Sequence, residues 1–321
     1  MTTFGDMLYF NGGIPVSSGN LPFTPSGGRY WFVDGTSGVG SDGNSGKKPS
    51  EALSTIQQAI TNAVSGDVVC VFPKKITDYT GDPTSYAETL IIPATKPHLT
   101  LAGVSHGLTQ GGLPQVKIGA GAVATLDIRA AGCLIMNMGF NGAGSTGKGI
   151  ILNDDNSTTT AFGTTITGCH FKNFAPSASL AASGGAINWT TAGNAWQVRI
   201  AGNRFYKNTA DIHLPGTSNS VPQDVVIERN IFSGPAASVS CNILFAGSGM
   251  SGVIINDNIF PCTPAAGGTN LVVSLIGVGV FSNNRTMTNG ATYGATGNGG
   301  VIPTGIAIAG NYQDGALIAR T

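Results

Sequence analysis

Charged residues are scarce in this sequence, and neither sign is in excess. Asp, Glu, Lys and Arg make up 10% of the 321 residues, against roughly 25% in an average soluble domain. Lys and Arg together number 16, as do Asp and Glu, so the formal net charge is zero. A nucleic-acid-binding domain usually carries a basic excess, and we therefore expect no nucleic-acid partner.

Long apolar runs and a recognisable leader are also lacking. No stretch reaches the roughly 18 apolar residues that a membrane helix needs, so we expect no membrane partner. The first ten residues, MTTFGDMLYF, contain neither a basic segment nor a long apolar one. They therefore predict no secretory signal.

Cysteines in CxxC pairs are absent as well. Their number is odd: Cys70, Cys133, Cys169, Cys241 and Cys262. Zinc sites and disulfide frameworks usually need such pairs or an even count. We therefore expect buried free thiols in a protein made in a reducing cytoplasm, and neither a metal nor another cofactor.

A short phrase, by contrast, returns several times: VRIAGNRFYKN at 198–208, VVIERNIFSG at 225–234 and VIINDNIFPC at 253–262. One apolar position of the phrase recurs every 25 to 34 residues and defines a frame: Leu101, Ile135, Ile166, Ile200, Ile227, Ile255, Val280 and Ile308. Such a period indicates a solenoid, and the alternation of apolar residues with period two excludes helical repeats. We predict an all-β parallel β-helix of about eight rungs.

Two further residue types follow the frame at fixed offsets. Asn stands three positions after it, at Asn203, Asn230, Asn258, Asn283 and Asn311. Phe stands five positions after it, at Phe140, Phe171, Phe205, Phe232 and Phe260. We predict that the Phe rings stack in a buried column and that Asn marks the bend between two strands, where it tolerates a left-handed backbone.

The segment before the repeat has a different pattern. Leu53, Ile56, Ile60 and Val64 follow helical spacing, so we predict a capping helix near residues 51–64. A helix laid over the first rung would protect an exposed strand edge. We divide the chain into an arm at 1–29, a cap segment at 30–66 and a parallel β-helix at 67–321.

The cap segment resembles the N-terminal signature of the pectate-lyase-like superfamily. The matching elements are Trp31-Phe32-Val33-Asp34-Gly35, Ser41-Asp42, Thr55-Ile56-Gln57, Ala59-Ile60, Gly66-Asp67-Val68-Val69, and Glu88 with Leu90 and Ile92. With the rungs, the resemblance covers roughly residues 30–315. It implies a right-handed, single-stranded parallel β-helix. This fold hosts lyases, glycoside hydrolases, phage tailspikes and non-enzymatic virion proteins, so it leaves the function open.

Enzymes of this superfamily carry acidic clusters on one outer face, and the resemblance suggests candidates here: Asp154, Asp155, His170 and Arg199. A carboxylate pair could act as general acid and base. However, GCHF at 168–171 replaces the Gly-His-Gly of the polygalacturonase-type hydrolases. A solvated turn explains Asp154 and Asp155 more simply, and an outward rung position explains Arg199, so we expect no catalysis. Trp189 and Trp196 are candidates for a sugar platform or for loop packing.

Outward positions of the rungs suggest an interface. Side chains alternate along a strand, which places an apolar stripe on the outside: Val226, Ile254, Phe281, Ala307 and Ala309. We predict that three-fold packing buries this stripe in a homotrimer; a loop of the same chain covering it is the alternative. In the arm, we predict that Leu8, Tyr9 and Phe10 contact another chain.

Two functions fit these observations. The first is a structural virion protein of a tailed bacteriophage, a capsid decoration (cement) protein located on the capsid surface, with the major capsid protein as partner. The missing signal, free thiols, low charge and apolar arm favour it. The second is a polysaccharide-degrading or glycan-binding β-helix protein resembling a tailspike. A sugar or a cation in a groove would favour the second.

Overall fold

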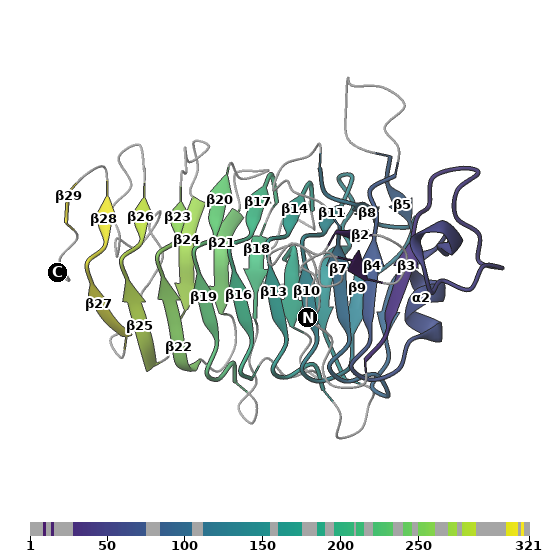
Figure 1. Ribbon diagram of the computed structural model, residues 1–321. Helices are drawn as coiled ribbons and strands as arrows, with labels where there is room; N and C mark the ends of the chain where they lie inside the picture. The colour runs from purple at the N-terminus through teal and green to yellow at the C-terminus, as the bar shows by residue number, and fades with distance from the viewer. Residues whose placement is uncertain are drawn as a thin grey trace.

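The structure is a computed structural model. It describes residues 9–10, 14–15, 28–74, 84–104, 112–154, 160–174, 185–189, 196–208, 210–214, 221–233, 240–245, 250–260, 269–274, 278–286, 306–313 and 316–317. The chain winds from the N-terminal cap to the C-terminal rungs in successive turns (Figure 1). The fold is the predicted all-β, right-handed parallel β-helix.

Three sheets form the sides of the coil, and the first has ten strands. Sheet 1 contains β3 (Tyr30–Val33), β4 (Val68–Val71), β7 (Thr100–Gly103), β10 (Leu134–Met136), β13 (Thr165–Thr167), β16 (Arg199–Ala201), β19 (Val226–Glu228), β22 (Ser251–Asn256), β25 (Val278–Ser282) and β27 (Ile306–Ala309). The frame of the repeat runs through β7 to β27, which accounts for the eight predicted rungs.

Sheets 2 and 3 follow sheet 1 in every complete turn. Sheet 2 contains β5 (Tyr86–Ala87), β8 (Gln115–Lys117), β11 (Gly139–Asn141), β14 (His170–Lys172), β17 (Arg204–Tyr206), β20 (Ile231–Ser233), β23 (Ile259–Phe260), β26 (Arg285–Thr286), β28 (Tyr312–Gln313) and β29 (Ala316–Leu317). Sheet 3 contains β6 (Leu90–Ile92), β9 (Ala124–Ile128), β12 (Lys148–Leu152), β15 (Ile187–Trp189), β18 (Ala210–His213), β21 (Ser240–Phe245) and β24 (Thr269–Ser274). Within the three sheets of the coil, all strand pairs are parallel except β28 with β29.

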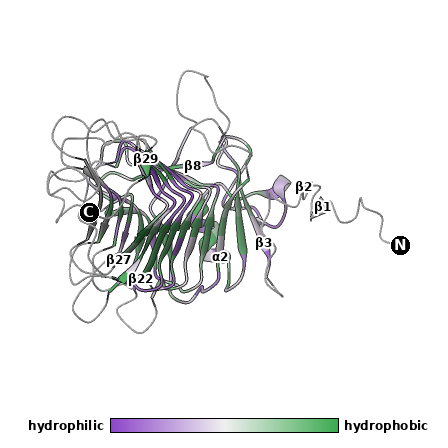
Figure 2. Cartoon of the chain, turned by 90° about the vertical axis from the view of Figure 1, so that its left-hand side faces the viewer, coloured by the Kyte–Doolittle hydropathy of each residue, from purple (hydrophilic) through white to green (hydrophobic). Residues whose placement is uncertain are grey.

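The core consists of side-chain columns along the coil axis, and Figure 2 shows the hydrophobic strands layered one behind another. The predicted aromatic column forms, with ring centroids 5.1, 5.1, 5.0 and 4.7 Å apart from Phe140 to Phe260. All five rings are fully buried. Parallel pairing in register produces this column, because it places equivalent residues of successive rungs directly against each other.

The predicted frame is correct as far as Ile255 and then slips by one residue. Ile255 pairs with Phe281, and Phe281 pairs with Ile308, so Val280 is outside the frame. The register shifts between Ser251 and Val253, where Gly252 has a φ of 63°. The irregularity moves the next strand by one residue, which reverses its faces. Phe281 is therefore 1% exposed and Val280 38% exposed.

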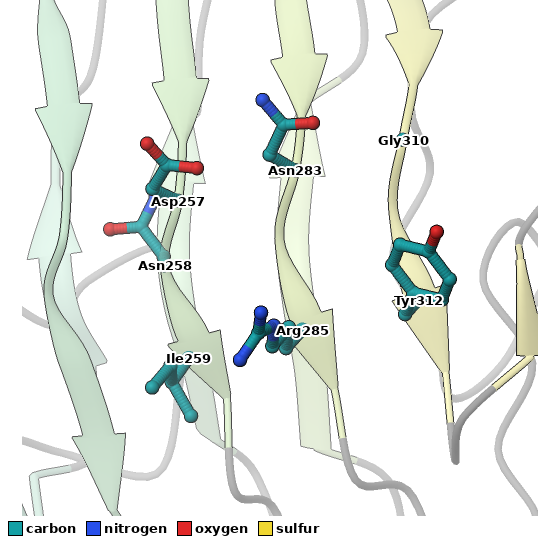
Figure 3. A pocket seen from close by; sticks show the side chains of 7 residues that line it. All are labelled: Asp257, Asn258, Ile259, Asn283, Arg285, Gly310 and Tyr312. Atoms are coloured by element: carbon teal, nitrogen blue, oxygen red, sulfur yellow. The ribbon is translucent and has the colours of Figure 1, made fainter.

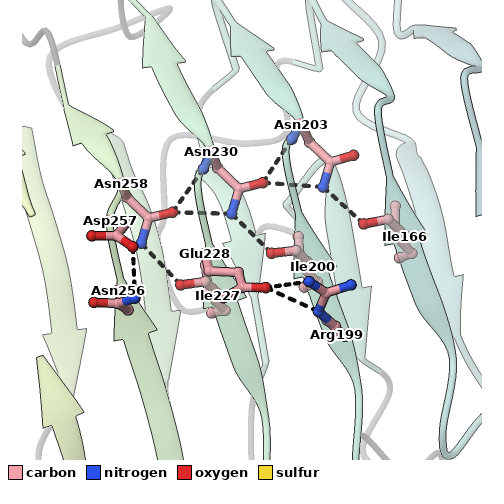
Figure 4. Close-up of polar contacts among 10 residues, drawn as sticks. All are labelled: Ile166, Arg199, Ile200, Asn203, Ile227, Glu228, Asn230, Asn256, Asp257 and Asn258. Atoms are coloured by element: carbon pink, nitrogen blue, oxygen red, sulfur yellow. Dashed lines mark hydrogen bonds and ion pairs between the residues drawn. The ribbon is translucent and has the colours of Figure 1, made fainter. Parts of the chain in front are cut away.

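The corner between sheets 1 and 2 contains a ladder of buried asparagines (Figure 4). The ladder is formed by Asn203, Asn230, Asn258, Asn284 and Asn311. Each Nδ2 but the last donates to the next Oδ1 at 3.0 to 3.1 Å. Because of the register slip, Asn284 replaces the predicted Asn283.

The ladder asparagines are not the left-handed residues of the bend. That conformation occurs one position earlier, for example at Arg229, Asp257 and Asn283, with φ of 53°, 55° and 54°. The bend therefore separates two tasks that we had assigned to one residue. The left-handed residue turns the chain, and the side chain of the following Asn satisfies buried backbone groups of the preceding rung: Asn230, for example, donates to the carbonyl of Ile200 and accepts from the N–H of Asn203.

The cap helix is shorter than predicted. A 3-10 turn, η1 (Pro49–Glu51), comes first, and α2 spans Ile56–Asn62 with Thr55 as its N-cap. Leu53 is not helical because it bridges to Val33 of β3. Val64 lies beyond the helix and is 56% exposed. Asp67, three residues later, is buried and accepts a hydrogen bond from the indole N–H of Trp31 at 2.8 Å. This bond fixes the cap on the first rung.

Candidate functional site

The structure does not bring together the three catalytic candidates that it describes, Asp154, His170 and Arg199. Asp154 follows β12 of sheet 3, His170 begins β14 of sheet 2, and Arg199 begins β16 of sheet 1. His170 is buried, and Arg199 forms an ion pair with Glu228 (Figure 4). Asp155 lies outside the described residues. Sequence order along three rungs was misleading, because it does not tell which of the three sheets each residue joins.

The two tryptophans also fail to form a platform. Trp189 is fully buried in the core, at the end of β15. Trp196 is 41% exposed, and its indole N–H donates to the carbonyl of Val221 at 3.1 Å. In the described part of the chain, no three His, Cys, Asp or Glu side chains come together as metal ligands would.

A cleft of about 400 Å³ lies instead on the outside of the last rungs, where sheet 1 turns into sheet 2 (Figure 3). Its lining residues are Asp257, Asn258, Ile259, Asn283, Arg285, Gly310 and Tyr312. None of them was a predicted site residue.

Each of three successive rungs contributes two residues of the same kind to this cleft. The first is the left-handed residue of the bend: Asp257, Asn283 or Gly310. The second is the first residue of the next strand: Ile259 of β23, Arg285 of β26 or Tyr312 of β28. Because the ladder asparagine between them points inward, the two flanking side chains point outward. The repeat therefore places two outward side chains beside the bend in each of these three rungs, and the chemistry of the cleft depends on these positions.

The last three rungs line the cleft with side chains of different chemistry. Asp257 is exposed, and one of its carboxylate oxygens accepts the amide of Asn256 at 2.9 Å. Arg285 lies between Ile259 and Tyr312 in the row of neighbouring strands. Tyr312 and Ile259 are 47% and 38% exposed. A carboxylate, an amide, a guanidinium group, an aromatic ring and an alkyl side chain thus face one open cleft.

A cluster of polar side chains on sheet 3 was also not predicted from the sequence. Asp211 and His213 share the face of β18 opposite Ile212, and each is 4% exposed. Asp211 accepts the amides of Asn208 at 2.8 Å and Asn242 at 2.7 Å. Burial raises the pKa of Asp211 to about 7, although both hydrogen bonds oppose the shift. The sequence signal was ADIH, two polar residues alternating with apolar ones in a rung, but sequence alone could not show their burial.

Three of the five residues predicted for the outward stripe, Val226, Ile254 and Ala307, lie in one row, whereas their role as an interface stays a prediction. Val226 pairs with Ile254, Ile254 with Val280, and Val280 with Ala307, so these four side chains form one outward row. Ile254 is 42% exposed. Phe281 was wrongly placed in the stripe, because the register slip turns it into the core. Ala309 is exposed but pairs with Ser282 in the adjacent row. We call the row from Val226 to Ala307 the apolar stripe.

Little of the arm can be compared with its prediction. Leu8 lies outside the described residues. Tyr9 and Phe10 form β1 (Tyr9–Phe10), which pairs antiparallel with β2 (Ile14–Pro15) as a separate two-stranded sheet. Contact of the arm with another chain stays a prediction. Among the described residues, no helix is long and apolar enough to cross a membrane.

Comparison with known proteins supports the fold. No family model matches the sequence, and no curated protein matches it. A pectin methylesterase from carrot is similar in structure at 14% identity, with a TM-score of 0.53, covering 92% of this chain and 86% of that one. A pectin methylesterase from Aspergillus niger has 16% identity, a TM-score of 0.44, and coverage of 92% and 89%.

A third similar structure is the pectate lyase Pel9A, at 13% identity and a TM-score of 0.36, covering 92% of this chain and 80% of that one. At such identities the likeness concerns the fold, and the carrot enzyme carries that argument because its TM-score is the highest of the three. Together with the parallel sheets and their register, it supports the right-handed parallel β-helix fold of this molecule.

Proposed function

We propose that this chain is a polysaccharide-binding β-helix protein and that the cleft at the last rungs holds the sugar chain. The observation that carries the proposal is the lining of the cleft, where a carboxylate, a guanidinium group and a tyrosine ring face solvent side by side. Ligand sites are typically concave, with apolar surface and a few convergent polar groups.

Each group has a role that suits a sugar. The ring of Tyr312 offers an apolar face for the C–H side of a pyranose, while its edge stays wet. The carboxylate of Asp257 accepts hydrogen bonds from hydroxyl groups, and the guanidinium group of Arg285 donates them. Because equivalent positions repeat on adjacent rungs, the groove runs along the coil axis and suits a linear polymer.

We propose binding without cleavage. Glycoside hydrolysis generally uses two carboxyl groups, about 5 to 9 Å apart. Among the described lining residues, Asp257 is the one carboxylate. Asp211 is too deeply buried to touch a polymer in this conformation.

Two other considerations bear on the proposal. The carrot and Aspergillus enzymes are named for action on pectin, so the same architecture accommodates a polysaccharide in those proteins. The capsid-decoration role, with a major capsid protein as partner and a virion location, stays a prediction from the sequence. No contact among the described residues favours it.

The test is a binding screen followed by one substitution. The protein would be screened against neutral and acidic polysaccharides by affinity electrophoresis, and the best ligand titrated calorimetrically. Tyr312→Ala should weaken binding about tenfold, because the ring loses its stacking partner. Phe162→Ala is the matched control, since Phe162 is 42% exposed and does not line the cleft.

Two results would overturn the proposal. One is that no polysaccharide binds the folded protein. The other is that Tyr312→Ala binds as tightly as Phe162→Ala. Release of new reducing ends or of methanol from a bound polysaccharide, if lost in Asp257→Asn, would replace binding by catalysis at the same cleft.

A further inference from the structure

The two ends of the coil differ in how their outermost strands are covered. At the N-terminal end, the cap segment pairs with the free edge of β3. Phe32 of this strand donates its N–H to the carbonyl of Gly46 at 2.8 Å, and its own carbonyl accepts the N–H of Leu53 at 2.9 Å. The backbone groups of the first strand are therefore satisfied within the chain, and this edge is closed.

The C-terminal end of sheet 1 has no such cover among the described residues. β27 is the last strand of the sheet and pairs with β25 on one side only. The strands at this end of the coil, β27, β28 and β29 (Figure 1), have the sequences IAIA, YQ and AL, which contain neither a charged residue nor proline. Proteins usually protect an open strand edge with such residues. The edge of β27 is thus suited to pairing with a further strand.

The asparagine ladder ends at the same edge with two partners missing. Asn311 donates its amide to the carbonyl of Phe281 at 2.8 Å, and its Oδ1 accepts the N–H of Asn284 at 2.9 Å. No described residue does the same for the carbonyl of Ile308 and the N–H of Asn311, although Asn311 is fully buried. Buried backbone groups are costly to leave unpaired, so this end favours a partner that supplies hydrogen bonds.

The core is also less covered at this end. The frame residues from Leu101 to Ile255, and Phe281 after them, are at most 2% exposed. Ile308, which pairs with Phe281, is only half-buried. A partner that covers the last rung would remove this apolar surface from water, which adds to the gain from hydrogen bonding.

The open edge is complementary to a second copy of itself. Asn283 donates its N–H to the carbonyl of Ala309 at 3.0 Å, so Ala309 faces the preceding rung. Successive residues of a strand direct their backbone groups to alternate sides, and Ile308 therefore directs its N–H and carbonyl to the open side. In an antiparallel pair, two residues opposite each other exchange both hydrogen bonds. A two-fold axis perpendicular to sheet 1 would place Ile308 opposite the same residue of a second copy.

We propose that the C-terminal ends of two copies of this chain meet around a two-fold axis, with their β27 strands paired antiparallel so that sheet 1 continues from one copy into the other. Because the N-terminal end is closed by the cap, each copy offers one edge, and association stops at a pair instead of growing into a fibre. The described end strands carry no charge, so two identical ends meet without repulsion between like charges.

This contact is separate from the apolar stripe and compatible with it. The stripe ends at Ala307 on β27 and faces away from sheet 1, along the direction of the proposed two-fold axis. A three-fold axis in front of the stripe would intersect that two-fold axis. The two contacts can therefore coexist in an assembly of six chains, and end pairing requires neither the trimer nor the polysaccharide.

The experiment measures the mass of the full chain by sedimentation and light scattering over a range of concentrations, after thermal melting has shown that each variant folds. Ile308→Pro removes the N–H that faces the open side, and no hydrogen bond within the chain depends on it. Ile308→Val is the matched control, because it keeps the N–H and most of the side chain. Ile254→Lys tests the stripe separately.

We expect the wild type to contain two or six chains. Ile308→Pro should halve that number and raise the dissociation constant of the pair at least tenfold, because each copy loses one donor. Ile308→Val should leave the pair intact, as should Ile254→Lys. Hydrogen exchange of the wild type gives a second measurement that needs no variant. Amides at 306–311 should exchange more slowly in the associated protein than in the dilute one, whereas those of the cap should not change.

Four results would overturn the proposal. The first is a wild type with one or three chains at every concentration, and the second is growth into filaments. The third is a pair that persists in Ile308→Pro or gives no added protection at 306–311; if Ile254→Lys also separates that pair, the contact belongs to the stripe. The fourth is equal dissociation of Ile308→Pro and Ile308→Val, which would mean that the side chain, not strand pairing, holds the copies together.

Discussion

Two groups of polar side chains on the outside of the coil differ in what solvent can reach. The cleft at the corner of sheets 1 and 2 exposes Asp257, Arg285 and Tyr312. The group on sheet 3, around Asp211 and His213, is buried and hydrogen-bonded within itself. Both arise from polar residues at outward positions of a rung. A polar side chain that points outward from a rung is therefore not sufficient for a binding site, because the site must also be accessible to solvent.

The comparison makes different predictions for stability and for binding. Changes in the sheet 3 group should alter the free energy of unfolding, since buried polar groups are costly to leave unsatisfied. Changes in the cleft should alter ligand binding with little effect on folding, because exposed substitutions are usually mild. The predictions below run from the largest expected effect on unfolding to the smallest.

The largest effect is the pH dependence caused by Asp211. Its pKa in the folded protein is about 7, above its ordinary value of 3.8, so the folded state binds the proton more tightly. The stabilisation is therefore complete below pH 4 and is lost as the pH rises to 7, by on the order of 4 kcal/mol. Asp211→Asn should flatten this decline. Urea unfolding at pH 5, 6, 7 and 8 measures it, and parallel curves for the two proteins would contradict the prediction.

A smaller loss of folding stability is expected when a hydrogen-bond partner of Asp211 is removed. Asn242→Ala deletes an amide that donates to the Asp211 carboxylate at 2.7 Å. We expect a loss of about 2 kcal/mol at pH 8, where the carboxylate is charged, and less at pH 5, where it is protonated. Unfolding by urea at the two pH values measures this difference. An equal loss at both would mean that packing, not the hydrogen bond, is responsible.

The cleft should respond in the opposite way. Asp257→Asn should change the free energy of unfolding by less than about 1 kcal/mol, since the side chain is exposed and Asn tolerates the left-handed backbone. Binding of the polysaccharide selected by the screen should weaken about tenfold. Calorimetric titration and thermal melting of the same sample test both parts. A large loss of stability with unchanged binding would reverse the roles assigned to the two regions.

The apolar stripe on sheet 1 is a third kind of outward surface. Its side chains are uncharged, and they are not buried like the polar group on sheet 3. We predict that it mediates self-association into a homotrimer. Ile254→Lys should leave the stability of the single chain nearly unchanged, because Ile254 is 42% exposed, but should abolish the trimeric contact, because a buried unpaired charge opposes association. Light scattering measures the mass. A wild-type monomer, or a variant that remains trimeric, would reject the stripe as an interface.

The prediction of the fold succeeded where the repeat is strict, and the prediction of the site failed where it is not. From Leu101 to Ile255 the frame gives the register of sheet 1. The pairing of β22 with the next strand, β25, contains an irregularity at Gly252 that no spacing rule detects. As a result, Phe281 replaces Val280 in the frame and Asn284 replaces Asn283 in the ladder. Arg285 and Tyr312 were missed because their pairing depends on this corrected register.

The sequence by itself determined the repeating unit: its parallel rungs, its aromatic column and the presence of a cap, because these follow from local alternation and from identical residues recurring at one period. Only the tertiary structure decided which outward residues reach solvent. Asp154, His170 and Arg199 are close in rung order yet lie on three different sheets, whereas Asp257, Arg285 and Tyr312 converge on one cleft. Accessibility depends on how whole rungs stack and what packs over them, and a one-dimensional period carries no information about that covering.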